Sequence, residues 1–245
     1  MTTKVEPTTT STPGVAAAAA APTKKYRVGV VDDHTMMREG VRLFLENLPD
    51  FECAWSADTS AAGISQLEAD PPDVLIVDIT LPDRHGIEFV KDALVLYPSI
   101  PVLILSMHDE RIYAQRALKA GAKGYLMKNA PHDVFEKALR RVVAGGFWLN
   151  QEVADEILAA FSKSSVPRAE GLLHILTDRE LEVFQLIGDG LGTAEIAESL
   201  HISPKTVDVH RANIRTKLQL PDGAALIRFA IRWVEARRTS PTPPQ

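Results

Sequence analysis

Five short apolar runs, separated by stretches with helical periodicity, constrain the fold of this chain more than any other feature of its sequence. Several runs lack the alternation of polar and apolar residues that a half-solvated strand has, so we expect strands that helices bury on both faces. The pattern predicts an α/β fold with a doubly wound, five-stranded parallel sheet. The predicted strands are residues 26–31, 51–55, 73–78, 101–106 and 124–127.

The length of the chain indicates more than one domain. It has 245 residues, which suits two domains of about 100–200 residues each. We expect the α/β domain over 24–146 and an all-α, four-helix domain over 172–238, joined by a linker helix and a flexible linker over 147–171. The termini, 1–23 and 239–245, are predicted to be disordered, because they are rich in Thr, Pro, Ala and Ser and lack apolar periodicity.

Local signals in the second domain predict a helix-turn-helix unit. Thr177 and Glu180 form a T-x-x-E capping box at a helix start. Ser203 is a favourable N-cap before Pro204, which suits the first helical position. A final helix follows, and its Trp233 region is a candidate dimer surface.

Composition narrows the class of protein. The chain is 45% hydrophobic and 24% charged, as expected for a soluble globular protein. One cysteine, Cys53, cannot close an intramolecular disulfide, and the apolar run 15–21 is too short to span a bilayer, so we expect a cytoplasmic protein. The net charge of -5 argues against a nucleic-acid binder with a wholly basic surface, but it allows a local basic patch.

Polar residues gather at the predicted strand ends. Asp32 and Asp33 follow the first strand and Asp78 ends the third, so three carboxylates meet at one edge of the sheet. Oxygen ligands of this kind suit Mg²⁺. Ser106 and Lys128 add a hydroxyl and an ammonium group at the same edge, which suits a phosphoryl group. The alternative is that these Asp residues only cap helices. It does not explain why five polar residues gather at the ends of four strands.

Four motifs at these strand ends resemble those of a two-component receiver domain. The resemblance implies that Asp78 is the phosphoacceptor and that Asp32, Asp33, Asp78 and the backbone carbonyl of Thr80 hold Mg²⁺. It also implies that Ser106 and Lys128 contact the acyl phosphate, while Tyr125 is a switch residue that turns inward on phosphorylation. The motifs are VDDH at 31–34, IVDITLPDRHG at 76–86, ILSMHD at 104–109 and GYLMK at 124–128.

The C-terminal motifs LTDREL at 176–181 and ISPKTVDVHRANIRTKL at 202–218 resemble the LuxR-type DNA-binding domain of NarL/FixJ-type response regulators. A helical projection places Val207, Ile214 and Leu218 toward the core. The opposite face would read the major groove, and its flanks would meet phosphates. The expected reading face is Lys205, Asp208, Val209, Ala212 and Thr216, and the expected flanking residues are Thr206, Arg215 and Lys217.

Together the two resemblances imply a DNA-binding transcription factor that is controlled when a partner histidine kinase phosphorylates Asp78. Its own catalysis would be limited to slow autodephosphorylation. One short reading helix contacts few bases, so we expect a homodimer on paired half-sites. Phosphorylation would either release a reading helix masked by the receiver or create a receiver dimer, and the sequence leaves both routes open.

Two rival functions remain in view. The first is a phosphorylation-independent DNA-binding regulator with a purely structural receiver, which leaves the complete acid, Ser and Lys set without a role. The second is an enzyme with Mg²⁺-dependent phosphatase or flavin chemistry, which leaves the helix-turn-helix half unexplained.

The histidines show no spacing typical of a metal site, so we expect them on the surface or beside the site rather than as ligands. They are His34, His85, His108, His132, His174, His201 and His210.

Overall fold

The computed structural model describes residues 25–162 and 173–238. The segments expected to be disordered, 1–23 and 239–245, and most of the expected flexible linker lie outside the described residues.

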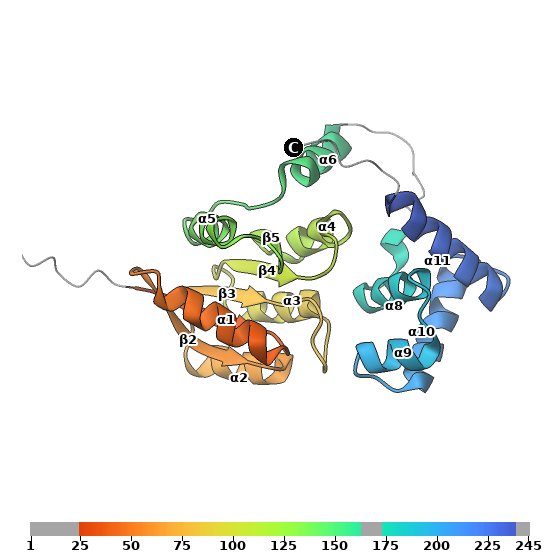
Figure 1. Cartoon of the computed structure of the whole chain (residues 1–245), viewed down its shortest axis with the longest axis horizontal. Helices are drawn as coiled ribbons and strands as arrows, with labels where there is room; N and C mark the ends of the chain where they lie inside the picture. The colour runs from red at the N-terminus through yellow and green to blue at the C-terminus, as the bar shows by residue number, and fades with distance from the viewer. Residues whose placement is uncertain (1–24, 163–172, 239–245) are drawn as a thin grey trace, which may run out of the picture.

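The first half is a five-stranded parallel sheet in the order β2-β1-β3-β4-β5, which confirms the predicted α/β fold (Figure 1). β3 and β4 are buried along their whole length, as their unbroken apolar sequences predict. The strands are β1 (Tyr26–Val31), β2 (Phe51–Ala57), β3 (Val74–Val77), β4 (Val102–Ser106) and β5 (Gly124–Met127).

Helices cover both faces of this sheet and produce two apolar layers. One layer contains Val41, Leu45 and Phe135 and lies under α1 and α5. The other contains Leu67 and Phe89 and lies under α2, α3 and α4. The helices of this half are α1 (Thr35–Glu46), α2 (Ser60–Ala69), α3 (Gly86–Leu96), α4 (Glu110–Ala120) and α5 (His132–Val143).

The connection to the second half begins with an extended segment. Tyr125 N–H donates to the Trp148 carbonyl, and Trp148 N–H donates to the Lys123 carbonyl. Each N···O distance is 3.0 Å. The helix predicted from residue 147 therefore begins later, as α6 (Gln151–Ser162), because Trp148 is paired with the edge of β5.

The second half is helical and contains the predicted helix-turn-helix unit. Both hydrogen bonds of the predicted capping box form between Thr177 and Glu180, and Ser203 accepts a hydrogen bond from Thr206 N–H at the start of α10. After the short 3₁₀ helix η1 (Leu173–Ile175), the helices are α8 (Asp178–Gly188), α9 (Thr193–Ser199), α10 (Pro204–Lys217) and α11 (Gly223–Arg238).

Trp233, whose region the sequence suggests as a dimer surface, packs in the core of the helical half. Its ring meets Phe184 edge-on at 5.6 Å between centroids, and the residue is 8% exposed. Trp233 itself is therefore a packing residue within this chain.

The carboxyl ends of the strands point toward α8 and α9 in Figure 1. The helical half thus lies at the edge of the sheet where an open α/β fold places its functional site. Within 25–162 and 173–238, no helix is both long enough and apolar enough to cross a bilayer.

Candidate functional site

The three acidic residues predicted at the strand ends come together in the structure. Carboxylate oxygens of Asp32, Asp33 and Asp78 and a ring nitrogen of His34 all lie within 4.8 Å of one another. Asp32 and Asp78 are buried, and Asp33 is partly exposed. Like charges at this separation repel, so the group requires a cationic partner.

Lys128 supplies that partner from the segment after β5. Its Nζ lies 2.8 Å from Asp32 Oδ2 and 2.7 Å from Asp78 Oδ2. Burial raises the pKa of Asp78 to about 6; Lys128 opposes this rise and Asp32 adds to it. At neutral pH, Asp78 is therefore still mainly a carboxylate, and it is held against an ammonium group.

The donor set fits a hard divalent cation. Asp32, Asp33 and Asp78 offer carboxylate oxygens, which are the ligands that Mg²⁺ prefers. Thr80 lies on the loop two residues after Asp78, and its backbone amide lowers the pKa of the Asp78 carboxyl. These donors are therefore of the kind that suits a divalent cation such as Mg²⁺.

The phosphate-contacting residues expected from the sequence also face this edge. Ser106 is fully buried at the end of β4, and its Oγ accepts a hydrogen bond from His108 N–H over 3.1 Å. The Tyr125 hydroxyl donates to the His108 carbonyl over 2.8 Å. The Tyr125 ring, expected to turn inward on phosphorylation, is already buried in this structure.

The loop that carries Asp78 and Thr80 is fixed from two sides. Asp83 accepts hydrogen bonds from the backbone N–H groups of Ser60 and Ala61 over 2.9 Å each, which ties the loop to the start of α2. At Gly86, a Cβ atom would lie 1.9 Å from the Asp78 carbonyl oxygen, so only glycine fits there.

Of the residues that surround the acids, His34 lies as the sequence suggests and Asp83 was missed. His34, expected on the surface or beside the site, is exposed and has Nδ1 2.6 Å from Asp33 Oδ1. Its position directly after two aspartates is the signal for this place. Asp83 gave no comparable signal, because its partners are more than 20 residues away in the chain and only the folded loop brings them together.

The predicted reading helix, α10, has the expected two faces. Val207 and Ile214 are fully buried and Leu218 is half-buried. The opposite face is solvent-exposed, with Val209 at 52%. The exposed residues of that face are Lys205, Asp208, Val209, Ala212 and Thr216.

The flanking residues of α10 are partly engaged within the chain. Lys217 Nζ lies 2.6 Å from Glu180 Oε2, and the Thr206 hydroxyl lies 2.8 Å from Ser203 Oγ. Arg215 is half-buried. A phosphate contact by Lys217 therefore requires it to exchange or share its present carboxylate partner.

Comparisons with known proteins agree with both halves. A family model described as "Response regulator receiver domain" matches residues 28–140, and one described as "Bacterial regulatory proteins, luxR family" matches 174–230. The chain is 34% identical to the transcriptional regulatory protein DegU of Brevibacillus brevis over 228 residues, covering 87% of this chain and 97% of DegU.

Two further similarities extend over most of the chain. The oxygen regulatory protein NreC of Staphylococcus carnosus is 31% identical over 210 residues, covering 84% of this chain and 97% of NreC. A solved structure of RcsB from Salmonella enterica serovar Typhimurium, bound to promoter rprA with the phosphomimetic BeF3⁻, aligns with a TM-score of 0.56. It is 25% identical and covers 84% of this chain and 98% of RcsB.

Proposed function

Because this chain belongs to the response regulators that join a receiver domain to a LuxR-family DNA-binding domain, we propose that it regulates transcription through phosphorylation of Asp78 by a sensor histidine kinase. The observation that carries this proposal is the contact of Lys128 with both Asp32 and Asp78 at the sheet edge. We assign the receiver to 24–146, the linker helix and flexible linker to 147–171, and the DNA-binding domain to 172–238.

The chemistry is a phosphoryl transfer to the Asp78 carboxylate. An oxygen of Asp78 forms a bond to phosphorus as the P–N bond of the kinase phosphohistidine breaks, and the electron pair stays on the imidazole nitrogen. The Lys128 ammonium group lies where it can neutralise charge on the phosphoryl oxygens. Ser106 and Tyr125 would then respond to the new group.

Asp32, Asp33, Asp78 and the Thr80 carbonyl would hold Mg²⁺ at this edge. When bound, the ion would offset the negative charge that the carboxylates and the phosphoryl group share. The protein would act as a phosphoacceptor rather than an enzyme, with slow autodephosphorylation as its only turnover.

The output is DNA binding by α10 in a homodimer on paired half-sites. Lys205, Asp208, Val209, Ala212 and Thr216 would face the bases, and Thr206, Arg215 and Lys217 would face phosphates. The similar RcsB is bound to promoter DNA in the presence of a phosphomimetic, which supports the same link in this chain. A DNA target places the protein in the cytoplasm.

Labelling of the full chain tests this function. With acetyl phosphate and Mg²⁺, intact-mass spectrometry should show one added phosphoryl group, and Asp78→Asn should abolish it. Asp73→Asn, which alters an acid at the opposite end of β3, is the matched control and should label normally. A chain that binds DNA but takes no label would support the rival, phosphorylation-independent function.

A further inference from the structure

Helix α8 of the DNA-binding half lies against the rim of the phosphoacceptor pocket. The Thr80 hydroxyl donates to Glu182 Oε1 over 3.1 Å, and His108 Nε2 lies 3.6 Å from the same oxygen. Glu182 has no exposed surface in this arrangement. The other carboxylate oxygen of Glu182, Oε2, accepts a hydrogen bond from Arg179 Nη1 of the same helix over 2.7 Å, so a buried ion pair lies at the rim.

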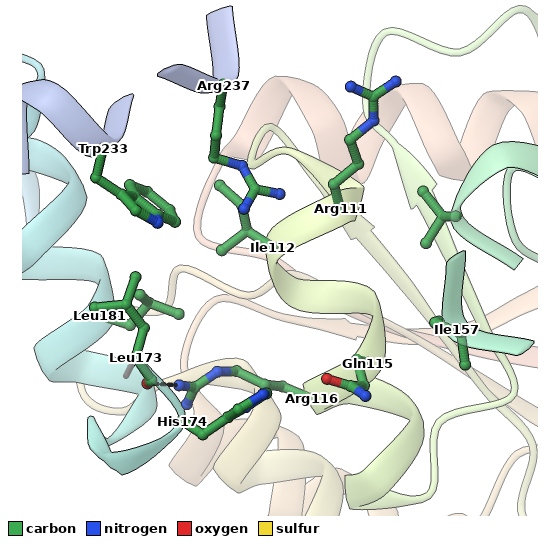
Figure 2. A pocket seen from close by; sticks show the side chains of 11 residues that line it. Arg111, Ile112, Gln115, Arg116, Ile157, Leu173, His174, Leu181, Trp233 and Arg237 are labelled. Carbon is green, nitrogen blue, oxygen red and sulfur yellow. Dashed lines mark hydrogen bonds between the residues drawn. The ribbon is translucent and has the colours of Figure 1, made fainter. Parts of the chain in front are cut away.

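Further contacts continue along α4. The buried Tyr113 hydroxyl donates to Gln185 Oε1 over 2.6 Å. Arg116 donates to Asp178 Oδ1 over 2.8 Å. It also donates to the Leu173 carbonyl over 2.7 Å (Figure 2). One guanidinium group thus joins α4 to both η1 and the first residue of α8.

A contact also reaches the acidic group itself. His201, in the turn between α9 and α10, has Nε2 3.6 Å from Asp33 Oδ2. The DNA-binding half therefore meets the pocket at three receiver residues, Asp33, Thr80 and His108, and Asp78 beneath them is 3% exposed.

The reading helix takes no part in this covering. Lys205, Asp208, Val209, Ala212 and Thr216 are solvent-exposed while α8 is docked. The masking route that the sequence left open, in which the receiver covers the reading face, is therefore not the arrangement of this structure.

We propose that docking of α8 on the receiver controls access to Asp78 and leaves the reading helix free for DNA. This inference rests on the proposed role of Asp78 as phosphoacceptor. A phosphodonor must pass the rim formed by Thr80 and His108, where Glu182 now lies. After transfer, the phosphoryl group adds negative charge to a pocket whose rim is covered by the Glu182 carboxylate, which disfavours renewed docking. Docking and phosphorylation thus oppose each other, and by linkage the effect is reciprocal.

The two halves do not fill the space between them completely. A cavity of about 210 Å³ remains between α4, α6, η1, α8 and α11, lined by residues of both halves (Figure 2). Ile112 and Trp233 face it from opposite halves. An interface with polar contacts and an open pocket costs less to separate than a filled apolar interface.

Arg116→Asp in the full chain tests the inference, because it removes the contacts of Arg116 and repels Asp178. The rate of Asp78 labelling by acetyl phosphate should rise at least about fivefold. Lys119→Asp, an exposed change of the same charge on the same helix, is the matched control and should label at the wild-type rate. The pair Arg116→Asp with Asp178→Arg restores opposite charges and should slow labelling again.

DNA binding provides the second measurement. With a duplex selected by the wild-type chain from a randomised library, the unphosphorylated Arg116→Asp chain should bind within about twofold of wild type. A large gain in DNA affinity would mean that docking restrains the reader and would overturn the inference.

The outcomes separate this inference from the function beneath it. Equal labelling rates in wild type and Arg116→Asp would overturn only the gating by α8. No labelling of Asp78 in either chain, with thermal unfolding showing that both are folded, would overturn the proposed function and the inference with it.

Discussion

At the residue scale, the shape of the site depends on a residue that takes no part in its chemistry. Gly86 lies so close to the Asp78 carbonyl that an added methyl group would have no space. The sequence marks Gly86 only as part of a motif, and the reason for glycine becomes visible when the loop is folded against β3.

Gly86→Ala should therefore displace the Asp78 backbone. We expect a loss of stability of about 1–3 kcal/mol in denaturant unfolding and a strong loss of acetyl phosphate labelling. Gly40→Ala on α1, where nothing lies within 4 Å of the added Cβ, is the control. It should stabilise the chain by up to about 1 kcal/mol and leave labelling unchanged. Normal labelling in Gly86→Ala would show that the loop accommodates the methyl group.

Asp208 gives a residue-scale prediction at the other end of the molecule. It is exposed on the reading face of α10, where an acidic side chain can accept a hydrogen bond from a cytosine amino group. Asp208→Ala should relax base preference at one position of each half-site in a randomised-site selection. An unchanged preference would remove Asp208 from base reading.

At the element scale, the strands, the parallel sheet and the helix caps were predictable, because each leaves a local pattern. β3 and β4 are unbroken apolar runs, and the Thr177 and Ser203 caps precede their helices as predicted. The start of α6 was missed by four residues, because the pairing of Trp148 with β5 is a tertiary contact.

The Ser203 cap at the start of α10 should affect both the stability of the chain and its affinity for DNA. Ser203→Ala removes the hydrogen bond to Thr206 N–H and should cost about 1 kcal/mol of stability. Thermal unfolding should show the loss, and DNA affinity should fall with it. Ser203→Asp retains an accepting oxygen and should remain close to wild type; a melting temperature as low as that of Ser203→Ala would contradict the capping role.

The junction between α4 and α6 has a pH-sensitive contact. Glu110 Oε1 accepts a hydrogen bond from Asn150 N–H over 2.7 Å, and burial raises the Glu110 pKa from its ordinary value of 4.5 to about 7. The folded state therefore favours the protonated carboxyl. Its stabilising contribution is complete below about pH 4.5 and is lost as the pH rises through about 7.

Glu110→Gln should remove this dependence, since an amide keeps an accepting oxygen without a charge. At pH 8 we expect the variant to be more stable than wild type by about 2 kcal/mol in urea unfolding, with a smaller difference at pH 5. Glu68→Gln, at an exposed position on α2, should retain the wild-type pH dependence. Parallel curves for wild type and Glu110→Gln would refute the assignment.

At the scale of the whole molecule, the net charge of -5 is the sum over segments whose own charges differ. Residues 172–238 carry nine basic and nine acidic residues, while 205–217 alone carries four basic residues and one acidic residue. The segment 205–217 of α10 is therefore basic, although the domain that contains it has no net charge. Few phosphate contacts are available to one copy, so we expect the affinity for DNA to depend on pairing of two copies.

Reliance on two copies predicts a strong dependence on both half-sites. Destroying one half-site of a selected duplex should weaken binding of the phosphorylated chain about a hundredfold, measured by fluorescence anisotropy at fixed salt. A change below about threefold would indicate that one reading helix suffices.

The arrangement of the two halves was beyond sequence reasoning. Glu182 and Thr80 are separated by 102 residues, and Arg116 and Asp178 by 62. No periodicity or motif links such pairs, because the contact depends on how two finished domains meet. The sequence predicts which residues gather at the sheet edge and which face of α10 is exposed, and the structure adds how one half lies over the other's pocket.

The docking of α8 joins two parts of one polypeptide, so its strength does not change with the amount of protein in the cell. The proposed pairing on DNA would be bimolecular, so the fraction of paired copies would grow with abundance. A cell that makes more of this regulator would therefore hold each copy equally closed but favour the paired form more strongly. Expression level would set how steeply transcription responds to a signal, while the contact between α8 and the receiver would set how much signal is needed to begin.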